Sequence, residues 1–231
     1  IMQDMINRGV DGIVMAACDE NALATAVAQA DAAGIPVVTF DSGVKSDVPK
    51  SFVATDNVAG AKLAADKLAE LMGGTGEVGL IPFVPGAATS ELREKGFKEG
   101  LQAHPGLKLA ATNYCQSDIA IGMNVTTDMI TAFPALGGIF AANEPAAIGA
   151  AQALRGLGKV GEVKLVAFDA SPEQIAALKE GVIQALVVQN PFKMGYEGVK
   201  AVIAAVKGQE VPKVIDTGVT IVTKENLDTP E

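Results

Sequence analysis

Short polar side chains follow one apolar segment after another in this sequence, and their types indicate what chemistry they could do. They are carboxylates, carboxamides and one hydroxyl: Asp41, Ser42, Asp56, Asn57, Asn143, Glu144, Asp169, Gln189 and Asn190. Such groups suit a ligand whose hydroxyls both donate and accept hydrogen bonds. Each bond contributes about 0.5 to 1.5 kcal/mol, or about 1.5 to 3 kcal/mol where one partner is charged. About five or six together could hold a small molecule with micromolar affinity, about −8 kcal/mol.

The same residues have a simpler interpretation as helix caps. Asp, Asn and Ser often precede a helix because their side-chain oxygen accepts a hydrogen bond from an N–H group of its first turn. Asn143 and Asp169 each come directly after an apolar run and shortly before a proline or a Ser-Pro pair. At these two positions a cap and a ligand contact are compatible, so both interpretations stay open.

The elements that must position these side chains alternate between apolar runs and helical patterns, which is typical of a parallel sheet built from βα units. We expect strands at 12–17, 35–40, 51–54, 76–81, 108–112, 136–141, 163–168 and 182–188. We expect helices at 20–33, from a cap at 55–57 to 72, and at 89–103, 118–132, 145–157, 172–179 and 191–206, then an extended tail at 211–222. Open α/β sheets bind ligands at the carboxyl ends of their strands, where these polar residues lie.

Composition narrows the class of protein. The chain has 231 residues, of which 49% are hydrophobic and 19% charged, which favours two compact lobes of ordinary size. The formal net charge of −9 disfavours nucleic acid and anionic lipid as direct partners. Every apolar run is too short to span a bilayer. Cys18 and Cys115 lack metal-ligand spacing and are expected to be free thiols.

The motifs that often mark enzymes are weak here. The glycine-rich stretch at 73–79 follows a helix and precedes a strand, the reverse of a phosphate-binding loop, so we interpret it as a turn. His104 is the only histidine, and it lies at a helix end, where it would cap carbonyl groups. We therefore predict no catalytic residue, no metal site and no cofactor.

Seven stretches in order resemble the periplasmic sugar-binding proteins of ABC importers, in particular the ribose-binding group. They are Gly-Ile-Val at 12–14, Gly-Ile-Pro-Val-Val-Thr-Phe-Asp at 34–41, Ala-Thr-Asp-Asn at 54–57, Arg-Glu-Lys-Gly-Phe at 93–97, Ile-Phe-Ala-Ala-Asn-Glu at 139–144, Val-Ala-Phe-Asp at 166–169 and Val-Gln-Asn-Pro at 188–191. Each motif alone is weak, but the set covers nearly the whole chain.

The resemblance implies an α/β fold with two doubly wound parallel-sheet lobes joined by three crossing segments. The lobes would be 1–55 with 190–216, and 56–189 with 217–231. By similarity, a monosaccharide or polyol would bind in the cleft between the lobes, and Phe168 would pack against it. The hydrogen-bonding residues would be Asp41, Arg93, Asn143, Asp169 and Gln189. The family also implies a monomer in the periplasm or outside the cell, lipid-anchored if the source is Gram-positive, with a membrane permease as its partner.

Departures from the family pattern leave the ligand open. Ser42 stands where ribose-type members often have arginine, and Ser117 stands where they often have an aromatic ring. Loss of a flat apolar platform weakens stacking on a sugar ring. Residues 1–8 resemble the second half of a helix, and family members place a β-α-β unit before it, so we expect the first lobe to be incomplete. A second hypothesis is the effector-binding core of a LacI-type transcriptional regulator.

Overall fold

The computed structural model describes residues 1–17 and 19–228, which form two compact units. The first unit comprises Ile1–Asp56 and Asn190–Gly218, and the second comprises Asn57–Gln189 and Val219–Glu231. The chain therefore passes from one unit to the other three times. That these units act as the two ligand-binding lobes stays a prediction.

The unit boundaries fall slightly beyond the predicted ones. Asp56, Thr217 and Gly218 belong to the first unit, because backbone hydrogen bonds hold them there. The Asp56 N–H donates to Asp216 Oδ1 at 3.3 Å, and the Thr217 N–H donates to the Ala54 carbonyl at 3.0 Å. The predicted extended tail is accordingly split at Gly218, whose φ of 79° suits glycine.

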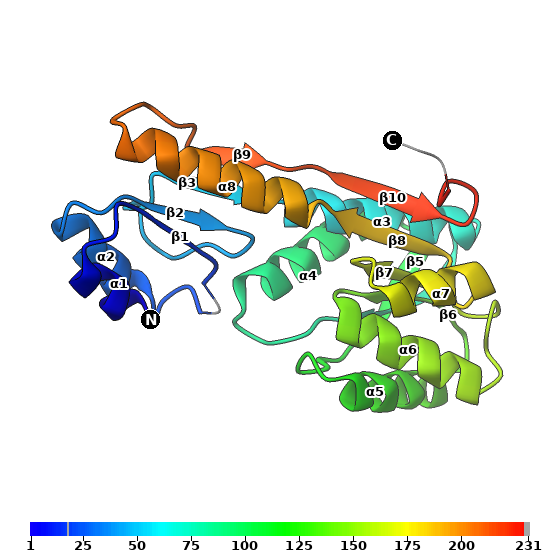
Figure 1. Ribbon diagram of the computed structural model, residues 1–231. Helices are drawn as coiled ribbons and strands as arrows, with labels where there is room; N and C mark the ends of the chain where they lie inside the picture. Colours follow the sequence, from blue (N-terminus) through cyan, green and yellow to red (C-terminus); the bar gives the residue numbers. More distant parts are fainter. Residues whose placement is uncertain (18, 229–231) are drawn as a thin grey trace. The chain divides into compact units, whose positions relative to one another are not determined.

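The first unit has a four-stranded parallel sheet in the order β1-β2-β3-β9. Its strands are β1 (Ile13–Met15), β2 (Val37–Phe40), β3 (Ser51–Ala54) and β9 (Val214–Asp216). Helix α8 (Pro191–Val206) covers one face, while α1 (Met2–Arg8) and α2 (Ala24–Ala32) lie on the other, as Figure 1 shows. Val37 faces α2 and its neighbour Val38 faces α8, which explains why this strand is apolar without alternation.

Helix α8 also carries an exposed apolar stripe on its side away from the sheet. The stripe consists of Phe192, Tyr196, Val199, Ile203 and Val206, spaced three or four residues apart. Phe192 is 82% exposed, and its ring stacks on Tyr196 with centroids 6.3 Å apart.

The second unit has a six-stranded sheet in the order β10-β8-β7-β6-β4-β5, in which only β10 is antiparallel. The strands are β4 (Gly76–Ile81), β5 (Leu107–Thr112), β6 (Leu136–Ala141), β7 (Lys164–Phe168), β8 (Ala185–Gln189) and β10 (Val219–Thr223). Helices α3 (Asn57–Leu71) and α4 (Ala88–Leu101) cover one face, and α5 (Ile119–Ala132), α6 (Glu144–Gly156) and α7 (Pro172–Glu180) cover the other (Figure 1). This layered α/β architecture confirms the predicted fold class.

Several predicted starts of elements were wrong for local reasons. The helix expected from 20 begins at Ala24, because the Asp19 carboxylate accepts hydrogen bonds from the Asn21 and Ala22 N–H groups and holds a turn first. The strand expected from 182 begins at Ala185.

The predicted role of His104 was also wrong. His104 does not cap carbonyl groups with its side chain, because its Nε2 lies 2.7 Å from the Asp66 carboxylate of α3.

Two of the predicted caps are confirmed, but Asp169 does not cap α7, because the side chain of Ser171 accepts the N–H of Gln174 there. Asn143 and Asn190 each accept a hydrogen bond from the first turn of the helix that follows, and Pro145, Pro172 and Pro191 occupy first turns. In the glycine-rich stretch, residues 73–75 form the turn that leads from α3 to β4, and residues 76–79 are already part of β4. Within the described residues, no helix is both long and apolar enough to cross a bilayer.

Candidate functional site

Arg93 is the centre of a polar cluster in the second unit. Its helix, α4, follows β4, and the guanidinium reaches back over the carboxyl ends of the central strands. Nε donates to Asn57 Oδ1 at 2.8 Å, and NH1 donates to the Ala142 carbonyl at 2.7 Å. The side chain is only 5% exposed, so these bonds hold its charge in a fixed position.

The guanidinium of Arg93 lies flat against an aromatic ring. Its Cζ is 3.7 Å from the centroid of the Phe168 ring and 5.7 Å from that of Phe83. Contacts of this kind are favourable by about 0.5 to 2 kcal/mol. Phe168 is itself fully buried, so the expectation that its ring packs against a ligand needs correction. The ring supports Arg93 instead, because it has no exposed surface to offer.

Asp169 lies between Arg93 and Gln189. Asp169 Oδ2 is 3.9 Å from Arg93 NH1, and Asp169 Oδ1 accepts a hydrogen bond of 2.6 Å from Gln189 Nε2. The other amide atom, Gln189 Oε1, is buried and has no hydrogen-bond partner among the described residues. A buried acceptor left in this state is costly and gains from a donor brought by a ligand or a water molecule.

Asn143 completes the group at the end of β6. It is 8% exposed, and its Oδ1 accepts the N–H of Ala146 at 3.1 Å as the cap of α6. Its Nδ2 donates to Ser117 Oγ at 2.9 Å. The cap interpretation is therefore correct for Asn143, and it leaves the amide nitrogen available for other contacts.

Asp41 belongs to the first unit, whereas the other predicted residues belong to the second. It follows β2 with a left-handed φ of 57°, and its N–H donates to the Val53 carbonyl at 2.9 Å. Ser42 Oγ donates to its carboxylate at 3.2 Å. The structure thus brings together the predicted residues of the second unit, Arg93, Asn143, Phe168, Asp169 and Gln189, and places Asp41 in the other unit.

The cluster is suited to binding rather than to bond breaking. It offers donors from Arg93 and Asn143 and acceptors from Asp169 and Gln189, with hydrogen-bonded or stacked support behind each. The described residues contain no group of three or more His, Cys, Asp or Glu side chains arranged for a metal ion. A polyhydroxylated molecule matches this mixture of donors and acceptors.

Sequence reasoning missed how Arg93 is positioned. Asn57 was considered as a ligand contact or a cap, yet it is 4% exposed and accepts from Arg93 Nε. The partner carbonyl of Ala142 has no signal in the sequence, because any residue type supplies one. Cys115 is a buried free thiol next to Asn143, and burial raises the pKa of that thiol. Cys18, also expected to be free, lies outside the described residues.

A hydrogen bond on the outer side of α4 gives a prediction about pH. The Tyr114 hydroxyl donates to Glu94 Oε2 at 2.5 Å, and this bond, with burial, raises the pKa of Tyr114 to about 12. The folded state therefore favours protonated Tyr114, and its contribution to stability is complete below about pH 10 and is lost as pH rises through about 12.

We expect Glu94→Gln to lower the pKa of Tyr114 toward 10, because the carboxylate that accepts its proton becomes neutral. Ultraviolet absorbance of the tyrosinate in a Tyr196→Phe background measures this, since the chain has two tyrosines. An unchanged midpoint of the tyrosinate titration in Glu94→Gln would show that the Glu94 carboxylate does not hold the proton of Tyr114.

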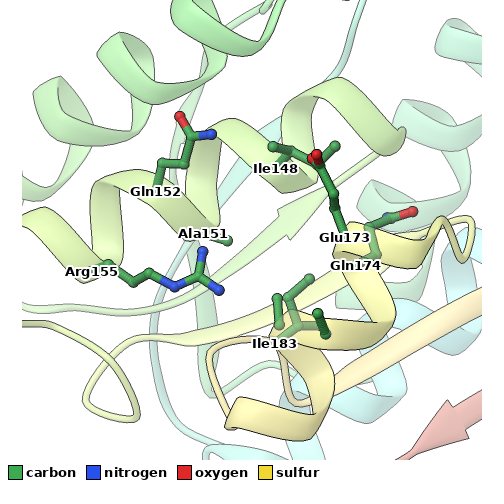
Figure 2. A pocket seen from close by; sticks show the side chains of 9 residues that line it. Ile148, Ala151, Gln152, Arg155, Glu173, Gln174 and Ile183 are labelled. Atoms are coloured by element: carbon green, nitrogen blue, oxygen red, sulfur yellow. The ribbon is translucent and has the colours of Figure 1, made fainter.

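A separate hollow of about 230 Å³ lies between α6 and α7 in the same unit. Figure 2 shows Ile148 and Ala151 of α6 facing it together with Ile183, while Arg155 lies at its edge. Two of its four polar side chains are engaged elsewhere: Arg155 pairs with Glu180 at 2.6 Å, and the Gln174 amide bonds the backbone of Ser171 and Phe168. The hollow offers a hydroxylated ligand less than the Arg93 cluster does.

Comparison with known proteins gives one consistent answer. Residues 1–210 match the family described as periplasmic binding protein domain. The ribose import binding protein of Salmonella typhimurium is 32% identical over 225 residues, covering 97% of this chain and 75% of that protein.

Solved structures agree. An ABC transporter solute-binding protein from Agrobacterium vitis with bound D-fucose is 38% identical, with a TM-score of 0.93 over 99% of this chain and 80% of its own. A carbohydrate transporter solute-binding protein from Agrobacterium radiobacter in complex with D-arabinose is 36% identical, with a TM-score of 0.94 over 99% and 79%. On this evidence the chain belongs to the periplasmic binding protein family.

Proposed function

We propose that this chain is a solute-binding receptor of an ABC importer and that its ligand is a monosaccharide or a polyol. The observation that carries the proposal is the Arg93 cluster, in which donors and acceptors lie side by side at the carboxyl ends of the central strands of the second unit. The named ligands of its relatives, ribose, fucose and arabinose, are all small polyhydroxylated molecules.

Each residue has a proposed role toward the sugar. Arg93 and Asn143 donate to ring or hydroxyl oxygens, while Asp169 and the free Oε1 of Gln189 accept from hydroxyls. Asp41 contributes a further acceptor from the first unit. Phe168 acts through Arg93, since stacking holds the guanidinium in place.

The proposed contacts come from both units, so both units must bind the same ligand molecule. We propose that the ligand stabilises an arrangement in which Asp41 and the Arg93 cluster contact it at once, and that a membrane permease recognises this state. A location in the periplasm, or outside the cell with a lipid anchor, follows from the same role.

Thermal unfolding against a panel of D-ribose, D-arabinose, D-fucose, D-galactose and xylitol tests the proposal. A ligand that binds only the folded protein at about 100 times its Kd adds about 2.7 kcal/mol to the free energy of unfolding. For a domain of this size we expect the melting temperature to rise by about 5 to 10 °C with at least one sugar. Calorimetric titration then measures the Kd of the best sugar.

Asp169→Asn is the matched variant for this screen, because it keeps the shape of the side chain and removes its charge. We expect the best sugar to bind at least about tenfold more weakly to it. If no sugar or polyol changes the melting temperature of the wild-type chain, the proposal is wrong.

A further inference from the structure

Ser117 is a polar residue beside the Arg93 cluster to which the proposed function gives no role. It sits in a turn whose backbone is unusual, because Gln116 and Ser117 both have left-handed φ values, 54° and 57°, without being glycine. Non-glycine residues adopt this region rarely, and when they do the surrounding structure holds them there.

The turn is held on both sides. The buried Cys115 donates its N–H to the Pro82 carbonyl at 3.0 Å, next to the end of β4. The Asp118 N–H donates to the Cys115 carbonyl at 3.0 Å, and the Asp118 carboxylate caps α5 through the N–H of Ile121 at 2.9 Å. Ser117 Oγ is therefore presented from a fixed point of the backbone.

The amide of Asn143 can be accounted for atom by atom. Its Oδ1 accepts from the Ala146 N–H at 3.1 Å and lies 4.0 Å from the Cys115 thiol. Its Nδ2 carries two N–H groups, one of which donates to Ser117 Oγ at 2.9 Å. No other described residue accepts the second N–H, although Asn143 is only 8% exposed. The orientation of the amide is thus set by the α6 cap on one side and by Ser117 on the other.

We infer that Ser117 is a positioning residue that fixes the Asn143 amide, so that its second N–H is presented to the ligand as a single donor. This inference rests on the proposed function, and it adds a statement about ligand chemistry. The Ser117 hydroxyl accepts from one N–H of Asn143. The second N–H therefore faces the ligand as a donor, and the ligand atom placed against it is an acceptor oxygen.

The test compares Ser117→Ala, Asn143→Ala and the double variant by calorimetric titration with the sugar from the panel that binds the full chain most tightly. We expect Ser117→Ala to raise the Kd by about 3- to 10-fold and Asn143→Ala by about 10- to 100-fold. In the Asn143→Ala background, Ser117→Ala should change the Kd by less than about 2-fold, because Ser117 acts through Asn143.

Three further measurements separate positioning from a structural role. Ser117→Cys keeps a small, unbranched side chain at this left-handed φ but offers only a weak acceptor, so it should raise the Kd about as much as Ser117→Ala. Ser46→Ala is the control, since Ser46 Oγ also accepts one hydrogen bond, from the Val48 N–H at 3.2 Å, in a loop of the first unit. The melting temperatures of Ser117→Ala and Ser46→Ala should stay within about 2 °C of wild type, because Ser117 is exposed, Ser46 is only half-buried and each substitution removes a single hydrogen bond.

A sugar-free measurement covers the case in which the proposed function fails. In the nuclear magnetic resonance spectrum of the unliganded chain, the Asn143 side-chain amide, assigned by its loss in Asn143→Ala, should exchange faster with water in Ser117→Ala than in wild type. Wild type that binds no sugar would overturn the proposed function, while this exchange difference would still support the positioning role. The positioning role would be overturned if the effects of the two substitutions on the Kd multiplied in the double variant. It would also be overturned if the Asn143 amide exchanged at the same rate in Ser117→Ala as in wild type.

Discussion

Replacing Arg93 with lysine should weaken binding of the best sugar at least about 30-fold, equivalent to about 2 kcal/mol. Lysine keeps the charge, but its single ammonium cannot bond Asn57 Oδ1 and the Ala142 carbonyl at once in the geometry of Nε and NH1. It also lacks the planar group that stacks on Phe168 at 3.7 Å. Calorimetric titration of the folded variant measures the loss.

Arg155→Lys is the matched control for this substitution. Arg155 lies in the same unit and pairs with Glu180 at 2.6 Å, yet both side chains are about half exposed, so the pair contributes little. We expect its affinity for the sugar and its melting temperature to equal those of wild type. If Arg93→Lys bound the sugar within about 3-fold of wild type, Arg93 would not be the central donor.

Substitution of Gly96 by alanine should destabilise the second unit by about 2 to 3 kcal/mol, and so lower its melting temperature by roughly 5 to 10 °C. A Cβ at Gly96 would lie 2.3 Å from the Val58 carbonyl oxygen and 2.8 Å from Val58 Cα, so the clash is with backbone that cannot rotate away. The gain in helix propensity, up to about 1 kcal/mol, offsets only part of the cost.

This variant also links stability to the site. Gly96 and Gly100 let α4 approach α3 closely, and α4 carries Arg93 while α3 begins at Asn57. Separating the helices stretches the bond from Arg93 Nε to Asn57 Oδ1, so we expect sugar affinity to fall together with the melting temperature.

Gly156→Ala provides the control, because a Cβ there meets no atom within 4 Å and the residue ends helix α6. We expect it to leave affinity unchanged and to add about 0.5 kcal/mol of stability, chiefly by restricting the unfolded chain. Equal melting temperatures for the two glycine variants would contradict the close-packing argument.

Much of the site was predictable because parallel strands end at the same edge of a sheet. Asn143 and Asp169 follow β6 and β7, and Gln189 ends β8, so once these neighbouring strands are recognised the residues at their ends must be neighbours. Arg93 required more, because it lies on a helix. Its membership in the cluster was inferred from the family resemblance rather than from strand order.

The roles of supporting residues could not be predicted in this way. Phe168 is the last residue of β7 and Asn57 follows β3, and nothing local tells a buried support from a ligand contact. Their burial depends on the packing of α3 and α4, where Gly96 of α4 meets Val58 of α3 and Gly60 of α3 lies against the Phe168 ring.

By itself, the sequence determined the alternation of strands and helices, the absence of a recognisable catalytic motif and the polar character of the strand ends. These features are local, because they follow from hydrophobic periodicity and from the caps that adjacent residues supply. Only the tertiary structure decided that Arg93 stacks on Phe168, that Asn57 and the Ala142 carbonyl hold it, and that Ser117 engages Asn143. The hydrogen bonds among these contacts join residues that are 26 to 49 positions apart in the chain. Packing of whole helices and strands brings such residues together.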